Sequence, residues 1–304
     1  MILTAALPAS AEGEEGLEAL LDDKAKVEKL AGDMKFVEGP VWDAQGFLLY
    51  SDIPANTIFK WSPGGTNEIF RRPSGNSNGL TLDREGRLIA CEHGNRRVSR
   101  TEKDGTVVTL AEKYGDKRLN SPNDLDVKSD GSIYFTDPPY GIRKEQQELE
   151  FNGVYRIAPD GTLTLLVKDF VRPNGIAFSP DENRLYVADS DPQVSHIRVF
   201  DVQADGTLSN GRVFAELKEP SQNGVPDGMK VDAEGNVFST GPGGVWVFAP
   251  DGKLLGKIAV PEVPANLAWG GNDYKTLYIT AQTGLYRIRL KTTGLKPGGV
   301  KMEQ

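Results

Sequence analysis

A strand-turn-strand motif recurs along this chain and constrains its fold more than any other feature. The clearest copy starts at Asn123, passes through an alternating segment and a Ser-Asp-Gly turn, and ends with a β-rich segment at Asp137. Five further copies start at Glu38, Asn78, Asn174, Asp227 and Ala265. A period of roughly 40 to 50 residues with this content is typical of propeller blades, because one small sheet buries its faces only against neighbouring copies.

The residues between the copies supply further strands. A third strand is predicted in every copy, at Thr57 to Trp61, Arg97 to Thr101, Gly153 to Ile157, Ser195 to Phe200, Gly244 to Phe248 and Gly284 to Leu290. A fourth follows another turn, as at Val107 to Leu110, but the last copy lacks one. We expect the segment from Lys26 to Leu30 to fill that place, which closes the ring and removes exposed strand edges.

The predicted fold class is therefore all-β, a six-bladed β-propeller with four-stranded antiparallel blades, closed by an N-terminal strand. One propeller domain is predicted over residues 25–304, after an N-terminal extension at residues 1–24. Residues 1–11 contain a short apolar run followed by Ala9-Ser10-Ala11, which fits a signal-peptide cleavage site but lacks a basic start. This pattern favours a periplasmic or secreted protein, and a cytoplasmic location is the alternative.

Composition excludes several classes of function. The formal net charge of −8 disfavours nucleic acid and anionic membrane surfaces as partners. No apolar run reaches the ~18 residues that a membrane span requires, and no strand-Gly-x-Gly-x-x-Gly-helix segment of a dehydrogenase occurs. The single cysteine, Cys91, lies within a predicted strand, where packing in the core is a better explanation than catalysis.

Aligning the copies brings one residue of each blade into register at the start of the innermost strand. These residues are Glu38, Asn78, Asn123, Asn174, Asp227 and Ala265. They should ring one mouth of the central channel, and two carboxylates with three amides offer hard oxygen ligands that suit Ca²⁺ better than Zn²⁺. The alternative is a polar mouth that holds water, with Asn and Asp before Gly simply forming turns.

A second set in register lies at the end of the second strands. It comprises Asp52, Glu92, Asp137, Asp189, Gly241 and Ala281. Acids at strand ends commonly accept backbone N–H bonds, and we expect a structural role for most of them. His93 follows Glu92 directly and is a candidate general base, although a loop histidine without a role fits equally well. His196 lies within an alternating strand and is interpreted as structural.

Four segments carry a resemblance to a known family. They are GPVWDAQGFLLYSDIPANTIFKW from Gly39, NGLTLDREGRLIACEHGNRRVSR from Asn78, LNSPNDLDVKSDGSIYFTDPPYG from Leu119 and RPNGIAFSPDENRLYVADSD from Arg172. From about Leu30 onward the chain resembles the gluconolactonase, senescence-marker-protein-30 and luciferin-regenerating-enzyme family, in particular its bacterial gluconolactonase-like branch. The resemblance implies a six-bladed propeller with one divalent cation, usually Ca²⁺, and its motifs place the ligands on Glu38, Asn123, Asn174 and Asp227.

The resemblance also implies an activity, the metal-dependent hydrolysis of a lactone or other small ester. Asp227 is the first candidate for the base that activates water, with His93 or Glu92 as alternatives. Substrate contacts are expected from Asn78, Asn123, Tyr140 and Arg143, the last two within the 138–151 insertion.

Family members that act on sugar lactones carry an arginine where this chain has Ser121, so that substrate contact does not carry over. Mn²⁺, Mg²⁺ and Zn²⁺ are alternative cations. The alternative functions are a phosphotriesterase-like hydrolase on the same metal and a non-catalytic binding propeller stabilised by calcium.

Overall fold

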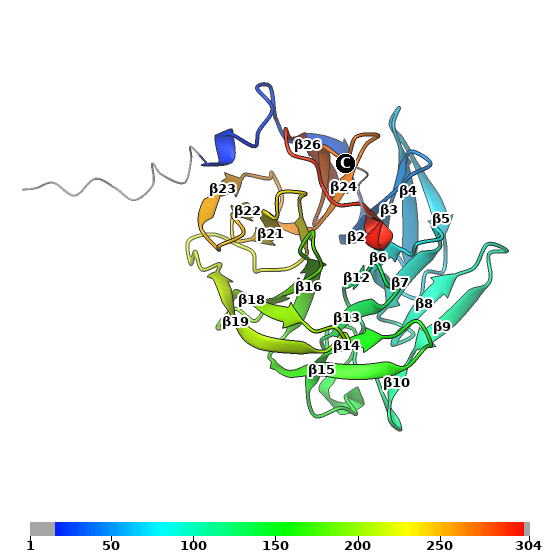
Figure 1. Ribbon diagram of the computed structural model, residues 1–304. Helices are drawn as coiled ribbons and strands as arrows, with labels where there is room; N and C mark the ends of the chain where they lie inside the picture. The colour runs from blue at the N-terminus through cyan, green and yellow to red at the C-terminus, as the bar shows by residue number, and fades with distance from the viewer. Residues whose placement is uncertain (1–15, 301–304) are drawn as a thin grey trace, which may run out of the picture.

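The computed structural model describes residues 16–300 and contains six four-stranded antiparallel sheets around a central axis (Figure 1). This confirms the predicted fold class. Within residues 16–300 no helix has the length and apolar character needed to cross a membrane. The candidate signal segment at residues 1–11 lies outside the described residues.

Each blade uses four strands in sequence order from the axis outward, except the last. Blade 1 contains β2 (Val37–Asp43), β3 (Phe47–Asp52), β4 (Thr57–Ser62) and β5 (Thr66–Arg71), and blade 2 contains β6 (Ser77–Leu82), β7 (Leu88–Glu92), β8 (Arg97–Thr101) and β9 (Val107–Ala111). Blade 3 contains β12 (Leu125–Val127), β13 (Ile133–Asp137), β14 (Asn152–Ile157) and β15 (Leu163–Phe170), and blade 4 contains β16 (Pro173–Phe178), β17 (Arg184–Asp189), β18 (His196–Val202) and β19 (Leu208–Glu216). Blade 5 contains β20 (Met229–Val231), β21 (Val237–Gly241), β22 (Gly244–Phe248) and β23 (Leu254–Ile258).

Blade 6 closes the ring with both ends of the chain. It contains β24 (Pro264–Gly270), β25 (Thr276–Ala281) and β26 (Gly284–Arg289), and its outermost strand is β1 (Glu28–Ala31), which pairs antiparallel with β26. This confirms the predicted closure. Leu17 and Leu20, from a helical turn at residues 16–20, are buried against the same blade. Residues 16–20, which the sequence places in the extension, therefore pack on the propeller.

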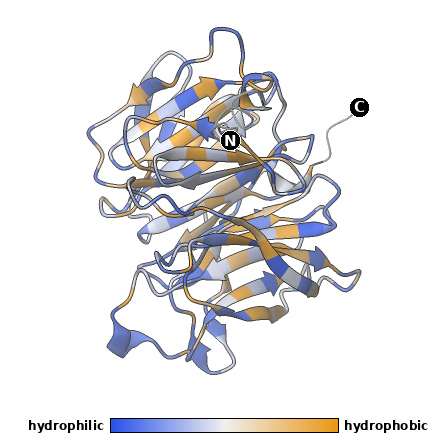
Figure 2. Cartoon of the chain, turned by 90° about the vertical axis from the view of Figure 1, so that its left-hand side faces the viewer, coloured by the Kyte–Doolittle hydropathy of each residue, from blue (hydrophilic) through white to orange (hydrophobic). Residues whose placement is uncertain are grey.

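The core lies between the blades, because each small sheet is covered on both faces by its neighbours. The innermost strands β2, β6, β16 and β24 are buried along their whole length. Apolar and polar residues both occur along the strands (Figure 2), and successive side chains of a strand point to opposite faces of its sheet. Stacked or edge-on aromatic pairs such as Trp42 with Tyr278 and Tyr134 with Phe178 fill the wedges between blades.

The acids at the ends of the second strands hold the loop that leads into their own blade. Asp52 accepts hydrogen bonds from the backbone N–H groups of Lys35 and Phe36, and Asp189 accepts them from Val171 and Arg172. Asp137 accepts one from the N–H of Asn120 at 2.7 Å. The predicted structural role is confirmed for these three carboxylates, and each one fixes the approach of the chain to the innermost strand.

A C-terminal strap, defined here as residues 291–300, crosses the end of the channel opposite the mouth that carries the aligned polar residues. It follows β26 and ends near η2 (Pro297–Gly299), which lies against β6 and β12 (Figure 1, red). Thr292 Oγ1 donates to Asp232 Oδ2 at 2.8 Å. Gly298 has a φ of 80°, and a Cβ there would lie 2.8 Å from the Asp83 carbonyl oxygen, so only glycine fits this crossing. The sequence pattern did not predict the strap, the β10 (Lys113–Tyr114) and β11 (Lys117–Arg118) hairpin, or η1 (Lys144–Gln146).

The pairing of β1 with β26 closes the ring and is called the closure seam below. Glu262 stabilises this seam because it links β1 to blade 6. Its carboxylate accepts hydrogen bonds from Thr283 N, Tyr286 Oη and Lys29 Nζ at 2.7, 2.6 and 3.0 Å. Burial alone would raise the pKa of Glu262, but these hydrogen bonds outweigh it and lower the pKa to about 2 from an ordinary value of 4.5. The stabilisation is therefore complete above pH 4.5 and is lost as the pH falls through the folded pKa.

We predict that Glu262→Gln lowers the melting temperature at pH 7, and that its difference from wild type shrinks as the pH falls from 4.5 towards 3. Melting curves of the two proteins across this range test the prediction, with Glu112→Gln at an exposed position as the control. A deficit that stays constant with pH would show that the charge of Glu262 does not stabilise the seam.

Candidate functional site

Four of the six aligned residues meet at one mouth of the channel. Glu38 lies in β2 and Asn174 lies in β16. Asn123 and Asp227 lie just before β12 and β20. Asn123 Nδ2 donates to Asn174 Oδ1. Asp227 lies close enough to both Asn174 and Glu38 for these two residues to influence its pKa. These four residues are called the central cluster below.

Glycine explains how the side chains of neighbouring blades come this close. Glu38, Asn78, Asn174 and Asp227 are each followed by glycine. Gly175 N donates to the Asp227 carbonyl at 3.0 Å, and a Cβ on Gly175 would lie only 2.1 Å from that oxygen. The glycine after each of these polar residues therefore does more than form a turn. It allows the innermost strands of neighbouring blades to approach each other around the axis.

The central cluster gathers negative charge where water is scarce. Glu38 is 2% exposed, and burial, followed by repulsion from the Asp124 carboxylate, raises the pKa of Glu38. Burial, followed by repulsion from Glu38 and Asp124, raises the pKa of Asp227. Because each carboxylate makes the ionised form of the other costlier, the arrangement favours a bound cation.

The donor set fits a hard divalent cation. Oδ1 of Asp227 and Oδ1 of Asn78 are buried without a hydrogen-bond partner among the described residues. Such oxygens are costly to bury unless they are coordinated, and carboxylate and amide oxygens are the ligands that Ca²⁺ and Mg²⁺ prefer. Within residues 16–300 no three His, Cys, Asp or Glu side chains are grouped closely enough to hold a metal, so such an ion would depend on amide oxygens.

Asn78 and His93 extend the cluster on the side of blade 2. Asn78 Nδ2 donates to Asn123 Oδ1 at 2.5 Å, and His93 Nε2 lies 3.0 Å from the same oxygen. Burial lowers the pKa of His93 to about 4, so the imidazole is neutral at pH 7. His93 is thus a weak base whose Nε2 contacts Asn123.

Glu92 has different surroundings from its neighbour His93. Its carboxylate accepts hydrogen bonds from Arg97 Nε at 2.8 Å and Ser99 Oγ at 2.5 Å, and Arg71 Nη2 lies 3.6 Å away. Burial would raise the pKa of Glu92, but the hydrogen bond from Arg97 and its other partners lower it. These contacts hold blade 2 together and leave Glu92 outside the central cluster.

The 138–151 insertion covers part of the mouth. Tyr140 Oη lies 2.6 Å from Ser190 Oγ, which accepts a hydrogen bond from Asn174 Nδ2 at 3.0 Å. Ser121, at the position where the family resemblance leads one to expect arginine, accepts a hydrogen bond from Gly141 N at 2.8 Å and so anchors the loop. Tyr140 is thereby connected to the central cluster, while the residue as a whole remains 43% exposed.

The other predicted substrate residue of this loop points elsewhere. The side chain of Arg143 is 80% exposed and lies 4.0 Å from Glu145. Arg172 occupies the rim instead, with its guanidinium 6.0 Å from the Tyr140 ring and its Nε 3.6 Å from Asp191. Sequence reasoning missed Arg172, although it lies directly before the Pro-Asn-Gly motif that supplied Asn174.

The sixth aligned residue, Ala265, contributes only backbone, because its carbonyl accepts a hydrogen bond from Gly228 N at 2.7 Å. The next residue, Asn266, reaches the cluster in its place, and its Nδ2 lies 3.0 Å from Glu38 Oε2. Asn266 and Asp124 were both missed, although each interrupts the register at a position where the other blades carry glycine.

The fold and the central cluster define a six-bladed propeller with an oxygen-rich centre fit for a hard cation. The model of the SMP-30/gluconolactonase/LRE-like region matches residues 36–283. The chain belongs to this family, as the resemblance in its motifs predicted.

Individual relatives agree. A gluconolactonase of Zymomonas mobilis is 38% identical, over 91% of this chain and 85% of its own. The solved structure of a gluconolactonase from Xanthomonas campestris is 38% identical with a TM-score of 0.83, covering 91% of this chain and 93% of that one. A calcium-binding protein, regucalcin, from Agrobacterium tumefaciens has the same fold at 21% identity and a TM-score of 0.76, over 90% of this chain and 97% of its own.

Proposed function

We propose that this protein is a lactonase that acts through one Ca²⁺ ion held by Glu38, Asn123, Asn174 and Asp227. The observation that carries the proposal is the Asp227 carboxylate, which has one buried oxygen without a partner beside a second buried carboxylate. The gluconolactonase relatives support hydrolysis of a carboxylic ester within a ring as the reaction class. The substrate is then a small lactone.

A bound cation would supply a Lewis acid that polarises the carbonyl oxygen of the lactone and stabilises negative charge on it. Glu38, Asn123, Asn174 and Asp227 would hold this ion through carboxylate and amide oxygen atoms. Asp227 accepts a proton from the water molecule whose oxygen attacks the carbonyl carbon. When the ring C–O bond breaks, that proton passes to the departing alkoxide oxygen, which yields the open-chain hydroxy acid.

The surrounding residues position the reactants. Asn78 and Asn123 present amide groups at the mouth, and Tyr140 offers an aromatic wall whose hydroxyl is fixed by Ser190. Neutral His93 fixes Asn123 through its Nε2 and does not need to take up a proton. Arg143 and Glu92 have no role in this mechanism, because the first faces solvent and the second is held by arginines.

We predict that the protein hydrolyses glucono-1,5-lactone or another γ- or δ-lactone, that EDTA abolishes the activity and that Ca²⁺ restores it. A pH-indicator assay on a lactone panel, with Ca²⁺, Mn²⁺, Mg²⁺ and Zn²⁺ added back separately, measures this. Activity on paraoxon-type triesters alone would favour the phosphotriesterase alternative. Absence of all hydrolysis, with Ca²⁺ still raising the melting temperature, would favour a binding propeller and contradict the proposal.

Asp227→Asn keeps the shape of the side chain but removes the proton acceptor and one ligand charge. We predict that kcat falls by about 10³-fold or more, since loss of a general base typically costs 10²- to 10⁴-fold. Steady-state assays at saturating Ca²⁺ test this, with Asp201→Asn as a control at a peripheral carboxylate bonded to Asn210. Wild-type turnover in the Asp227 variant would remove this residue from the mechanism.

A further inference from the structure

Two polar side chains lie in a register that is otherwise reserved for glycine. The residue after the aligned position is glycine in four blades, but it is Asp124 in blade 3 and Asn266 in blade 6. A Cβ on Gly79 would lie 2.7 Å from Asp124 Oδ1, and a Cβ on Gly228 would lie 2.0 Å from Asn266 Oδ1. Glycines of the adjacent blades therefore leave the space that these two side chains fill.

Asn266 bridges two buried carboxylates with one amide group. Its Nδ2 donates to Glu38 Oε2 at 3.0 Å and to Asp124 Oδ2 at 3.2 Å. The orientation of the amide is set by the backbone, because Leu267 N donates to Asn266 Oδ1 at 2.8 Å. Both hydrogens of Nδ2 are thus directed at the acids, and no other orientation of the amide satisfies all three contacts.

The bridge also fixes the direction of Glu38. Its Oε2 accepts hydrogen bonds from Asn266 and from Gly39 N, the latter at 2.7 Å. Among the described residues no hydrogen bond uses Oε1, so this oxygen is left for the central cluster. Asp124 is anchored in turn, since Leu125 N donates to its Oδ1 at 2.9 Å, and both Asp124 and Asn266 are 2% exposed.

We propose that Asp124 and Asn266 are positioning residues of the cation site. Asn266 orients the carboxylate of Glu38, and Asp124 adds a buried negative charge next to Glu38. The proposal rests on the proposed function only in requiring that the central cluster binds a divalent cation. A carboxylate in a poorly solvated channel attracts a nearby cation more strongly than it would in water. Partners of metal ligands typically change metal affinity 10- to 100-fold when replaced.

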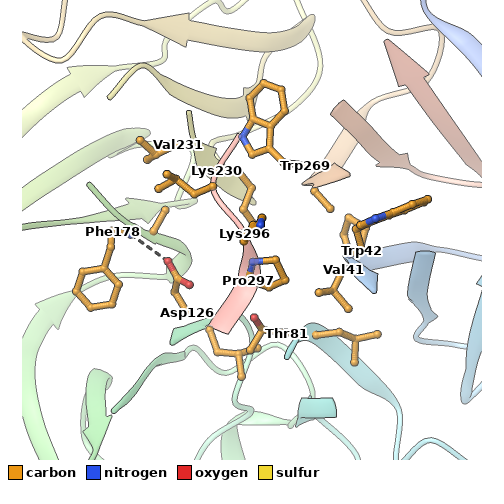
Figure 3. A pocket seen from close by; sticks show the side chains of 16 residues that line it. Val41, Trp42, Thr81, Asp126, Phe178, Lys230, Val231, Trp269, Lys296 and Pro297 are labelled. Atoms are coloured by element: carbon orange, nitrogen blue, oxygen red, sulfur yellow. Dashed lines mark hydrogen bonds between the residues drawn. The ribbon is translucent and has the colours of Figure 1, made fainter. Parts of the chain in front are cut away.

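The channel supplies a matched control. Its far end, closed by the strap, is a cavity of about 50 Å³ lined by all six innermost strands and containing Asp126 and Lys230 (Figure 3). Asp126 Oδ2 accepts a hydrogen bond from Phe178 N at 3.0 Å, and its Oδ1 accepts one from Val127 N. Asp126 is thus a channel carboxylate two residues from Asp124 that is bonded only to backbone groups.

The test is a calorimetric titration of EDTA-treated protein with Ca²⁺, for wild type, Asp124→Asn, Asn266→Leu and Asp126→Asn. We expect Ca²⁺ binding to be weaker by about tenfold or more in Asp124→Asn and Asn266→Leu. In Asp126→Asn, whose carboxylate does not contact Glu38, we expect a change of less than about twofold. At saturating Ca²⁺ the kcat of Asp124→Asn should return close to wild type, because the ligands and Asp227 are intact. A merely structural role would not produce this separation of affinity from turnover.

Each outcome is decisive. Unchanged Ca²⁺ affinity in Asp124→Asn, or an equal loss in Asp126→Asn, would overturn the positioning role. If Asn266→Leu does not fold, Asn266→Ser replaces it, and unchanged affinity in that variant contradicts the bridge to Glu38. Absence of Ca²⁺ binding by wild type would instead count against the proposed function itself, so the two failures are distinguishable.

Discussion

Close contact between the innermost strands of neighbouring blades is the constraint on which the site depends. Gly79 N, Gly175 N and Gly228 N each donate to a backbone carbonyl of the next blade, at 2.8, 3.0 and 2.7 Å. Any side chain at these glycines would collide with that neighbour. These bonds hold Asn78, Asn174 and Asp227, which precede the three glycines, next to the adjacent blade, and polar side chains therefore lie side by side around the axis.

The cost of this arrangement is electrostatic. Glu38 and Asp124 share Asn266 as a hydrogen-bond donor. Asp227 lies close enough to both carboxylates for their negative charges to raise its pKa. Burying like charges is unfavourable without a counter-charge. Lys230 offsets part of this cost for Glu38 and Asp124, and a bound cation would offset more of it. The strap crosses the far end of the channel, opposite the mouth beside Tyr140.

Much of this architecture is readable in the sequence because it repeats. Six copies of one motif predict six blades, and alignment of the copies selects the central cluster. The last copy lacks a fourth strand, which predicts closure of the ring by the segment near Glu28. The strap was missed because it occurs once and has no periodicity. Asn266 was missed because the alignment selects the residue before the glycine position, and in blade 6 that residue is Ala265.

Residues whose role depends on distant partners were harder to predict. Glu92 stands next to His93 in sequence, but Arg71 from blade 1 and Arg97 hold its carboxylate away from the axis. Arg143 belongs to the loop that carries Tyr140, yet only Tyr140 meets a partner, Ser190 of blade 4, that links it to the cluster. A strand period fixes which face a residue occupies, but the partner of a long polar side chain is set by the tertiary fold.

The proposed function requires that the converging oxygens of the central cluster bind one divalent cation. Equilibrium dialysis of EDTA-treated protein against radioactive calcium tests it most directly, because it counts bound ions without reference to any substrate. We expect one bound Ca²⁺ per chain for wild type and none for the double variant Asn174→Ala, Asp227→Ala. No bound calcium in wild type, or an equal amount in the double variant, would contradict it.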